Sequence, residues 1–562
     1  MTVLADPLLL LRELPALDPL DAQLAAMLVR RGGGGELEGV AIAIATLLLS
    51  RARREGYSAL SLRQLARHAG DMQAGAGHPL LASVPLREES WWAEVLVASP
   101  VIGNGQLVTP LVLRDGLLQF HRYFAAEERI AVRIRDLLAA PAIDGVPAFS
   151  IITGGPGTGK TTRVATLLVG MVLAQPGLRV SLAAPTGKAA ARLTESIRQR
   201  LQATDAVNGA DDATRRALLD LEARTLHRLL SYNGDTDTFR RNAGNPLPYD
   251  LVIVDEASMV DVLLLDTLLA ALRLGARLML VGDHHQLSSV EAGDVLGVLC
   301  RAAESAPAST ALHRAVTRLT HSWRFAEGKG IGATAAAILD GDAGAVWRTG
   351  HDATDTSIRI MPPAATAETL LAPVLPQLER CLAAESVEAM LDALESFRLL
   401  APEREGRRGV RGLNEAVERW LTRRGRAVTD IWYHGRPVLV TANDYSTRVF
   451  NGDIGVVWRT EGRTAVCFRS LDGTIRTIAP GRLPSVETAW AMTVHKSQGS
   501  EFDDVVMVLP SEESRVMSRE LLYTGVTRAR RSVTIIGSET SLRAAVQQRT
   551  ERTSGLGQRL IL

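Results

Sequence analysis

The spacing of apolar and polar residues changes twice along this chain and divides it into regions of different predicted structure. In residues 1–147, apolar side chains recur about every 3.6 positions, for example over 20–29 and 60–66. That period is typical of amphipathic helices. From residue 149 onward, short apolar runs alternate with polar loops and helical stretches. We therefore predict a mostly helical N-terminal region followed by an α/β region.

Short apolar runs in the α/β region predict buried parallel strands. They span residues 149–153, 180–184, 251–254, 278–281, 505–508 and 532–536. Polar loops and helical stretches between them predict a doubly wound layout, in which ligands bind at the carboxyl ends of the strands.

Residues 436–485 differ from the flanking α/β sequence in having short predicted strands linked by turns, without predicted helices between them. Four short strands are predicted at 437–441, 454–458, 464–468 and 474–478. Turn residues link them at Asn451–Gly452 and at 471–473. We expect a small β-barrel inserted into a second α/β domain.

One glycine-rich segment fits the phosphate-loop pattern G-x-x-x-x-G-K-[ST]. It reads Gly154, Gly155, Pro156, Gly157, Thr158, Gly159, Lys160, Thr161. A predicted strand precedes it and a predicted helix, 162–173, follows. Backbone N–H groups in such a loop surround phosphates at a helix N-terminus, where the helix dipole favours anions. We expect Lys160 to reach the β- and γ-phosphates of a nucleoside triphosphate, and the Thr161 hydroxyl to ligate Mg²⁺.

Composition narrows the class of protein without identifying a ligand. The net charge is +1, so any nucleic-acid binding must come from local sites. Three cysteines far apart in sequence exclude a disulfide scaffold and suit a reducing cytoplasm. The apolar runs 8–11 and 40–49 are too short to span a bilayer, and no membrane role is expected.

Lysine is rare in this chain, which uses arginine for almost every cation. Only four of its 63 Lys and Arg residues are lysines, namely Lys160, Lys188, Lys329 and Lys496. Because a compact ammonium and a planar guanidinium are not interchangeable, retained lysines indicate places where ammonium chemistry matters. Lys329 lies in a plain glycine-rich loop, where chance placement is the alternative explanation.

Polar residues that suit phosphoryl transfer follow the predicted strands. Asp255 can hold Mg²⁺ through water, and Glu256 can orient or deprotonate an attacking water. Gln286 follows the next strand and could contact the γ-phosphate. Arg324 and Arg528 lie near element ends, where an arginine can stabilise the charge of the transition state.

Taken in order, these segments resemble the motifs of superfamily 1 helicases, most closely those of the RecD family, the alpha subunits of exodeoxyribonuclease V. The resemblance runs from about residue 110 to the end. Its motifs are the phosphate loop and residues 184–188, 225–228, 255–258, 282–286, 322–325, 491–501 and 523–528, with further similarity at 413–415 and 450–455.

The resemblance implies two RecA-like motor lobes with ATP between them. The implied domains are an N-terminal partner-interaction domain (1–147), a first lobe that binds ATP (148–322), a second lobe in two parts (323–428 and 486–562) and the β-barrel insertion (429–485). The first lobe would bind phosphates and Mg²⁺ with residues 154–162, Thr162 included. The resemblance further implies that Arg324 and Arg528 come from the second lobe, and that Gln498 and Glu501 lie on the nucleotide side near the ribose.

Other motif positions resemble those that line a single-strand DNA path in the family. They are Pro185, Thr186, Lys188, Thr225, His227, Thr493, His495 and Lys496. The implied activity is ATP-dependent 5′-to-3′ DNA unwinding with RecB- and RecC-like partners at double-strand ends, during repair by recombination. Nuclease activity would belong to a partner.

Two alternatives stay open on the sequence. A stand-alone RecD-like helicase would usually carry a long N-terminal extension with DNA-binding hairpins, whereas 153 residues precede the phosphate loop here. A nucleotide-switched assembly or regulatory subunit would not translocate. One departure from the family keeps the second alternative open: residues 120–153 contain no glutamine to read adenine, which leaves base selectivity open.

Overall fold

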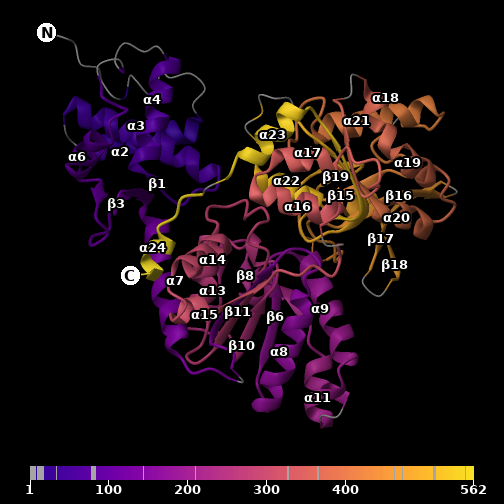
Figure 1. The fold of residues 1–562 in the computed structure, drawn as a ribbon, viewed down its shortest axis with the longest axis horizontal. Coiled ribbons are helices and arrows are strands. Elements are labelled where there is room, and N and C mark those ends of the chain that lie inside the picture. The colour runs from indigo at the N-terminus through magenta and orange to yellow at the C-terminus, as the bar shows by residue number, and fades with distance from the viewer. Residues whose placement is uncertain are drawn as a thin grey trace.

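The structure is a computed structural model in which three bodies are visible (Figure 1). One holds the N-terminal helices, and each of the other two contains a parallel sheet. The structure describes residues 8, 18–32, 35–76, 81, 84–143, 145–208, 211–325, 328–363, 366–428, 430–444, 446–460, 462–470, 473–510, 514, 516–550 and 552–561. No helix within these ranges is long and apolar enough to cross a membrane. Most of the apolar run at 8–11 and of the turn predicted at 471–473 lies outside them.

The N-terminal body packs helices around the apolar helix α3 and adds a small sheet. Its helices are α2 (Pro19–Gly32), α3 (Glu36–Arg54), α4 (Leu62–Ala76) and α6 (Glu89–Val97). Its strands, in the order β1-β4-β3-β2, are β1 (Leu60–Ser61), β4 (Leu117–Phe120), β3 (Leu111–Arg114) and β2 (Ile102–Gly103).

The core of this body ends earlier than the predicted boundary at 147. Its buried residues run from Ala25 to Leu118. Helix α7 (His121–Ala139) instead buries Ile130 and Ile134 in the core of the next body. The boundary therefore lies near residue 120, because the apolar face of α7 packs on the first parallel sheet.

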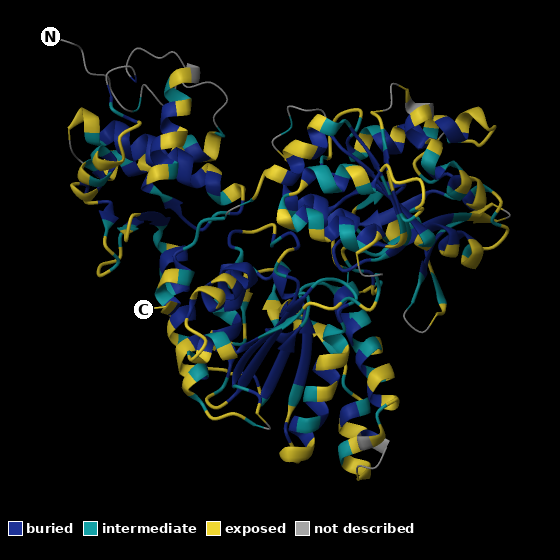
Figure 2. Ribbon diagram, in the orientation of Figure 1, coloured by how far each residue is buried: buried dark blue, intermediate teal, exposed yellow. Residues whose placement is uncertain are grey.

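The first lobe is a six-stranded parallel sheet with helices on both faces (Figure 2). In spatial order its strands are β12 (Val316–Leu319), β5 (Phe149–Gly154), β11 (Arg277–Gly282), β10 (Leu251–Val254), β6 (Val180–Ala184) and β7 (Ala223–Thr225). The four central strands are those predicted from the sequence. The prediction missed the two edge strands.

Two apolar cores cover the two faces of this sheet. One includes α7, α13 (Val262–Ala271), α14 (Val295–Ser305) and α15 (Ala311–Arg314). The other includes α8 (Lys160–Ala174), α9 (Gly187–Gln202) and α11 (Asp212–Leu219). Shorter elements are α10 (Asp205–Asn208), α12 (Leu226–Leu229), η1 (Ala257–Met259) and the hairpin of β8 (Tyr232–Asn233) and β9 (Thr238–Phe239).

The second lobe contains a five-stranded parallel sheet. In spatial order its strands are β13 (Ile358–Met361), β22 (Ala529–Ile536), β21 (Phe502–Val508), β14 (Phe397–Ala401) and β20 (Ala491–Thr493). Its helices are α16 (Gly330–Asp340), α17 (Ala343–Thr349), α18 (Ala367–Leu371), η2 (Ala372–Val374), α19 (Leu375–Leu382), α20 (Val387–Ser396), α21 (Val410–Arg423), η4 (His495–Ser497), α22 (Arg519–Val526) and α23 (Glu539–Gln547).

The inserted β module is an antiparallel sheet rather than the predicted barrel. Its order is β18 (Ile475–Ile478), β17 (Arg463–Arg469), β16 (Ile454–Thr460), β15 (Pro437–Val440) and β19 (Val486–Thr488), with the short turn η3 (Pro480–Arg482). Within the described part of the module the edge strands β18 and β19 do not pair, so hydrogen bonds do not close the sheet. One face still encloses an apolar core that includes Val440 and Phe468.

The C-terminal segment leaves the second lobe after α23 and crosses back to the other two bodies (Figure 1). Its last helix, α24 (Leu556–Ile561), buries Leu556 in the core of the first lobe. The two lobes are therefore joined twice along the chain, once after β12 and once after α23.

Candidate functional site

The phosphate loop joins β5 to α8 at the carboxyl edge of the first sheet. Gly157 and Gly159 have φ angles of 74° and 83°, which glycine adopts without steric cost. The Thr158 hydroxyl donates to the Gly155 carbonyl at 2.8 Å. Lys160 Nζ donates to the carbonyls of Gly154 (2.6 Å) and Gly155 (2.9 Å). The Lys160 ammonium is therefore hydrogen-bonded to the same loop with which it is expected to bind phosphate. Thr161, the second residue of α8, is half-buried, whereas Thr162 is exposed.

The adjacent carboxylates Asp255 and Glu256 follow β10 at the same edge of the sheet. Glu256 adopts φ 51°, ψ 39°, a left-handed conformation that costs a non-glycine residue about 1 kcal/mol or more. Its backbone N–H donates to Asp255 Oδ1 at 2.9 Å. Burial and the charge of Glu256 raise the pKa of Asp255 to about 7, against the opposing charge of Lys160. A carboxylate held in this way has a strong electrostatic preference for a cation.

Arg324 lies beside the phosphate loop, in the segment that connects β12 to α16. It follows β12, which pairs in parallel with β5 as far as Leu319 and Gly154. The Trp323 N–H donates to the Gly157 carbonyl at 2.9 Å. A Cβ on Gly157 would lie 2.3 Å from Arg324 Cβ, so only glycine fits this approach. Arg324 thus lies in the connection between edge strand β12, which the sequence did not predict, and the second lobe, on whose core the adjacent Phe325 packs. Its assignment to the second lobe stays a prediction.

Arg528 does come from the second lobe and meets Gln286 of the first. Its Nη2 donates to Gln286 Oε1 at 2.6 Å, and its Nη1 to the Ser500 carbonyl at 3.2 Å. The Gln286 amide donates to Asp283 Oδ2 at 3.1 Å, and the Tyr523 hydroxyl donates to the same oxygen at 3.0 Å. All of these groups are buried. They form a polar junction between the lobes.

Gln498 belongs to this junction as well. Its amide donates to the backbone carbonyl of Leu287 at 2.7 Å, and the Leu287 N–H donates to Thr524 Oγ1 at 2.9 Å. In this conformation Gln498 contacts the first lobe directly. Its expected position near a ribose stays a prediction.

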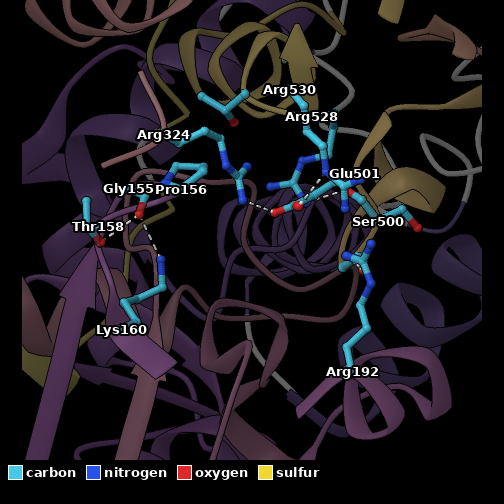
Figure 3. A network of polar contacts seen from close by, with 12 residues as sticks. Gly155, Pro156, Thr158, Lys160, Arg192, Arg324, Ser500, Glu501, Arg528 and Arg530 are labelled. Atoms are coloured by element: carbon cyan, nitrogen blue, oxygen red, sulfur yellow. Dashed lines mark hydrogen bonds and ion pairs between the residues drawn. The ribbon is translucent and has the colours of Figure 1, made fainter. Parts of the chain in front are cut away.

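Glu501 lies at the centre of a group of arginines (Figure 3). Arg324 Nη2 lies 2.5 Å from Glu501 Oε1, and Arg530 Nε lies 3.3 Å from Oε2. Although burial would raise the pKa of Glu501, the charges of Arg324, Arg192 and Arg530 bring it to about 2. The pair of Arg324 and Glu501 links the connecting segment beside the phosphate loop to the second lobe.

The residues expected on the DNA path gather at the carboxyl ends of β6, β7 and β20. Pro185 and Thr186 follow β6, Thr225 ends β7, and Thr493 ends β20. Each threonine Oγ1 accepts one backbone N–H of the next turn at 3.2 Å, from Ala189, Arg228 and Lys496 respectively. Since a hydroxyl that accepts such a bond still has its own proton to donate, the three threonines can each donate to a phosphate oxygen.

The basic residues expected on this path differ in their partners. Burial and the charges of Arg192 and Arg398 lower the pKa of Lys188 to about 8. Lys496 Nζ is paired with Glu487 at 2.7 Å. Burial lowers the pKa values of His227 and His495, which favours neutral imidazoles at pH 7.

Two residues near the nucleotide site were missed from the sequence. Trp323 is 80% exposed, packs edge-on against His321, and lies 3.8 Å from where a Cβ on Gly159 would be. Arg192 of α9 donates to the Gly499 carbonyl at 2.7 Å. An aromatic residue directly before Arg324 was a visible signal for Trp323. Arg192 had no such signal among so many arginines.

Gln119, one residue before the segment that lacks glutamine, does not replace the missing adenine reader. Its side chain is buried between the N-terminal body and α7. It donates to Glu127 Oε2 at 3.0 Å and accepts from Arg559 Nη2 at 2.9 Å.

A phosphate loop and paired carboxylates on one lobe, with a buried arginine junction to a second lobe, define a two-lobed nucleotide-driven motor of helicase superfamily 1. Family models agree with this class. Residues 142–292 match the AAA domain family and residues 488–536 match the UvrD-like helicase C-terminal domain. Residues 13–118 match the N-terminal domain of RecBCD enzyme subunit RecD, which ends where the N-terminal core ends.

The chain belongs to the RecD family of DNA helicases. It is 39% identical over 555 residues to RecBCD enzyme subunit RecD of Mycolicibacterium smegmatis, covering 92% of this chain and 93% of that one. It is 33% identical to an ATP-dependent RecD2 DNA helicase of Deinococcus radiodurans, over 82% of this chain but 59% of that one. A Pif1 helicase from Bacteroides, solved with ADP-AlF3 and single-stranded DNA, is 17% identical with a TM-score of 0.38, over 73% of this chain and 93% of that chain. That likeness is distant, and the family assignment does not depend on it.

Proposed function

We propose that this chain is the ATP-driven, 5′-to-3′ DNA translocase subunit of a RecBCD-type exodeoxyribonuclease. It would act in the bacterial cytoplasm with RecB- and RecC-like subunits at double-strand ends, during repair by recombination. The observation that carries the proposal is the placement of the expected nucleotide residues and the expected DNA residues along the facing edges of two parallel-sheet lobes.

On the nucleotide side, the phosphate loop would bind the β- and γ-phosphates through its backbone N–H groups and Lys160. Glu256 would orient the attacking water, and Arg324 would stabilise the charge that develops on the γ-phosphate. Gln286 of the first lobe and Arg528 of the second are hydrogen-bonded to each other. Through this contact, loss of the γ-phosphate on hydrolysis would change the position of one lobe relative to the other. Trp323 offers an exposed aromatic face beside the loop for stacking the base, where the family's glutamine is missing.

The residues present suit a magnesium ion. The Thr161 hydroxyl and the Asp255 carboxylate are the oxygen ligands that Mg²⁺ prefers, and the raised pKa of Asp255 signals an uncompensated carboxylate. Thr161 and Asp255 would hold the ion, whose charge would offset that of the phosphates when it is bound. Across the described chain no cluster of three or more His, Cys, Asp or Glu side chains could hold a metal by itself. This suits an ion that reaches the site with the nucleotide.

On the DNA side, threonine hydroxyls and basic residues would contact the phosphates of a single strand without reading its bases. A translocase needs contacts of this sequence-tolerant kind. The N-terminal body would bind the partner subunits. It exposes Leu107 and Val108 side by side, at 76% and 87%, in a loop before β3.

The test is DNA-stimulated ATP hydrolysis by purified protein. Lys160→Ala should reduce the stimulated rate at least a hundredfold, whereas Lys329→Ala, a lysine outside the site, should leave it unchanged. Equal hydrolysis by wild type and Lys160→Ala would overturn the proposal.

The stand-alone reading is tested by co-expression with RecB- and RecC-like subunits followed by size-exclusion chromatography. We expect a stable complex, because the chain matches RecD subunits over nearly their whole length but the RecD2 helicase over 59% of its length. A monomer that unwinds DNA efficiently alone would favour the stand-alone reading.

A further inference from the structure

Both cations expected to bind the triphosphate are held by oxygen atoms of the protein itself. Lys160 donates to two carbonyls of its own loop, and Arg324 pairs with Glu501 at 2.5 Å. Figure 3 shows the two cations on either side of the phosphate loop, with Glu501 beyond Arg324. A bound triphosphate would present oxygen atoms of the same charge and hydrogen-bonding character to both.

The Arg324 guanidinium keeps one donor free for another acceptor. Its Nη1 is buried and has no hydrogen-bond partner among the described residues. A buried, unpaired N–H costs about 1–3 kcal/mol. A phosphate oxygen near Arg324 could accept this hydrogen bond.

Positive charge exceeds negative charge around Glu501. Arg324, Arg530 and Arg192 surround it from both lobes, and Arg528 donates to the neighbouring Ser500 carbonyl. Glu501 and Asp503, which contacts Arg530 at 3.9 Å, cannot together neutralise four guanidinium groups. The group can accept a polyanion and still keep Glu501 ionised.

We propose that Glu501 is a positioning residue that occupies Arg324 in the nucleotide-free protein, and that the γ-phosphate displaces it. This inference rests on the proposed function, because it requires ATP at the phosphate loop. Nucleotide binding would exchange the ion pair of Arg324 and Glu501 for a pair of Arg324 with phosphate. Glu501 would keep Arg530 as its partner. Since Arg324 lies against the phosphate loop and Glu501 belongs to the second lobe, the exchange would also break one contact between that loop's surroundings and the second lobe.

The affinities of a Glu501→Gln variant for ADP and for an ATP analogue distinguish this positioning role of Glu501 from a contact to the ribose. With Glu501→Gln, Arg324 no longer has an anionic competitor, so a γ-phosphate should bind more tightly. ADP has no γ-phosphate, and its affinity should not change. A ribose contact would instead weaken ADP and ATP analogues to the same extent.

The experiment measures the dissociation constants of fluorescent ADP and of a fluorescent, slowly hydrolysed ATP analogue with the full chain. We expect Glu501→Gln to increase the ratio of the ADP constant to the ATP-analogue constant about fivefold, the effect of one partly exposed ion pair. Asp503→Asn is the matched control. Asp503 is a half-exposed carboxylate two residues away that contacts Arg530 at 3.9 Å and has no ion pair with Arg324. It should leave the ratio unchanged.

A double variant tests whether the effect passes through Arg324. In an Arg324→Gln background, Glu501→Gln should no longer change the ratio. Should Glu501→Gln fold poorly, Glu501→Asp keeps the charge but shortens its reach, and should shift the ratio in the same direction by less. An unchanged or decreased ratio in either variant overturns the inference. A wild-type chain that binds neither nucleotide would instead overturn the proposed function.

Discussion

Removing the Glu127 carboxylate should release the C-terminal segment from the other two bodies. Glu127 lies on α7 and is fully buried. Its two oxygens accept hydrogen bonds from the N-terminal body and from the segment after α23. The donors are Ser58 Oγ (2.7 Å), Gln119 Nε2 (3.0 Å), Ser554 Oγ (2.6 Å), the Gly555 N–H (3.1 Å) and Arg559 Nη1.

The free-energy cost of each substitution depends on which buried groups lose their hydrogen-bond or ion-pair partner. Glu127→Ala leaves the Arg559 guanidinium, only 12% exposed, without its buried counter-ion, and removes the acceptor for four other donors. Breaking a buried pair from one side costs about 3–5 kcal/mol. Glu128 also contacts Arg559, at 2.6 Å, but is 36% exposed. Glu128→Ala should therefore cost about 1 kcal/mol or less.

Hydrogen exchange of backbone amides measures this local opening directly. In Glu127→Ala, amides of α24 and of residues 552–555 should exchange roughly 10²–10⁴ times faster than in wild type, as expected for about 3–5 kcal/mol. In Glu128→Ala the same amides should change by about fivefold at most. Similar protection of these amides in both variants would refute the reasoning, because it would mean that the buried carboxylate does not hold the segment.

Three further predictions concern the nucleotide and DNA sites. Because phosphate favours the charged form of Lys188, whose pKa is about 8, affinity for single-stranded DNA should fall roughly three- to tenfold from pH 7 to 9. Lys188→Arg should flatten that profile in fluorescence anisotropy, and a flat wild-type profile would contradict us. Because Mg²⁺ needs an ionised Asp255 with a pKa of about 7, the Mg²⁺ concentration for half-maximal ATP hydrolysis should rise below pH 7. A requirement that stays constant between pH 8 and 6 would rule this out. Trp323→Ala should weaken both ADP and ATP about fivefold, with Trp323→Phe close to wild type; unchanged nucleotide binding in Trp323→Ala would exclude a stacking role.

The sequence predicted the four central strands of the first sheet, and β21 and β22 of the second, because continuous apolar runs report burial on both faces. It missed β14, a fully buried central strand of the second sheet. Strands β5, β6, β10 and β11 appear where they were expected. Edge strand β12 reads Val316-Thr-Arg-Leu319 and faces partly polar surroundings, so its apolar signal is weak. The boundary at residue 147 failed for a related reason, since periodicity shows that α7 is amphipathic but not which body covers its apolar face.

Local motifs predicted which residues gather at the sheet edges, but not how they pair across the lobes. The phosphate loop, Asp255 and Glu256 are contiguous motifs with a known context. The contact of Arg528 with Gln286 joins positions 242 residues apart, and that of Arg324 with Glu501 joins positions 177 apart. Spacing along the chain contains no signal for such pairs, because they depend on how the second lobe is placed against the first.

The central claim is that ATP hydrolysis at this site moves the chain along single-stranded DNA toward the 3′ end. Stopped-flow fluorescence tests it with oligonucleotides of increasing length, labelled at either end. For the 3′-labelled series, the time to reach the dye should increase in proportion to length with ATP, and Lys160→Ala should show no such phase. Hydrolysis stimulated by DNA without any length-dependent phase would contradict the claim and identify the chain as a nucleotide-operated switch.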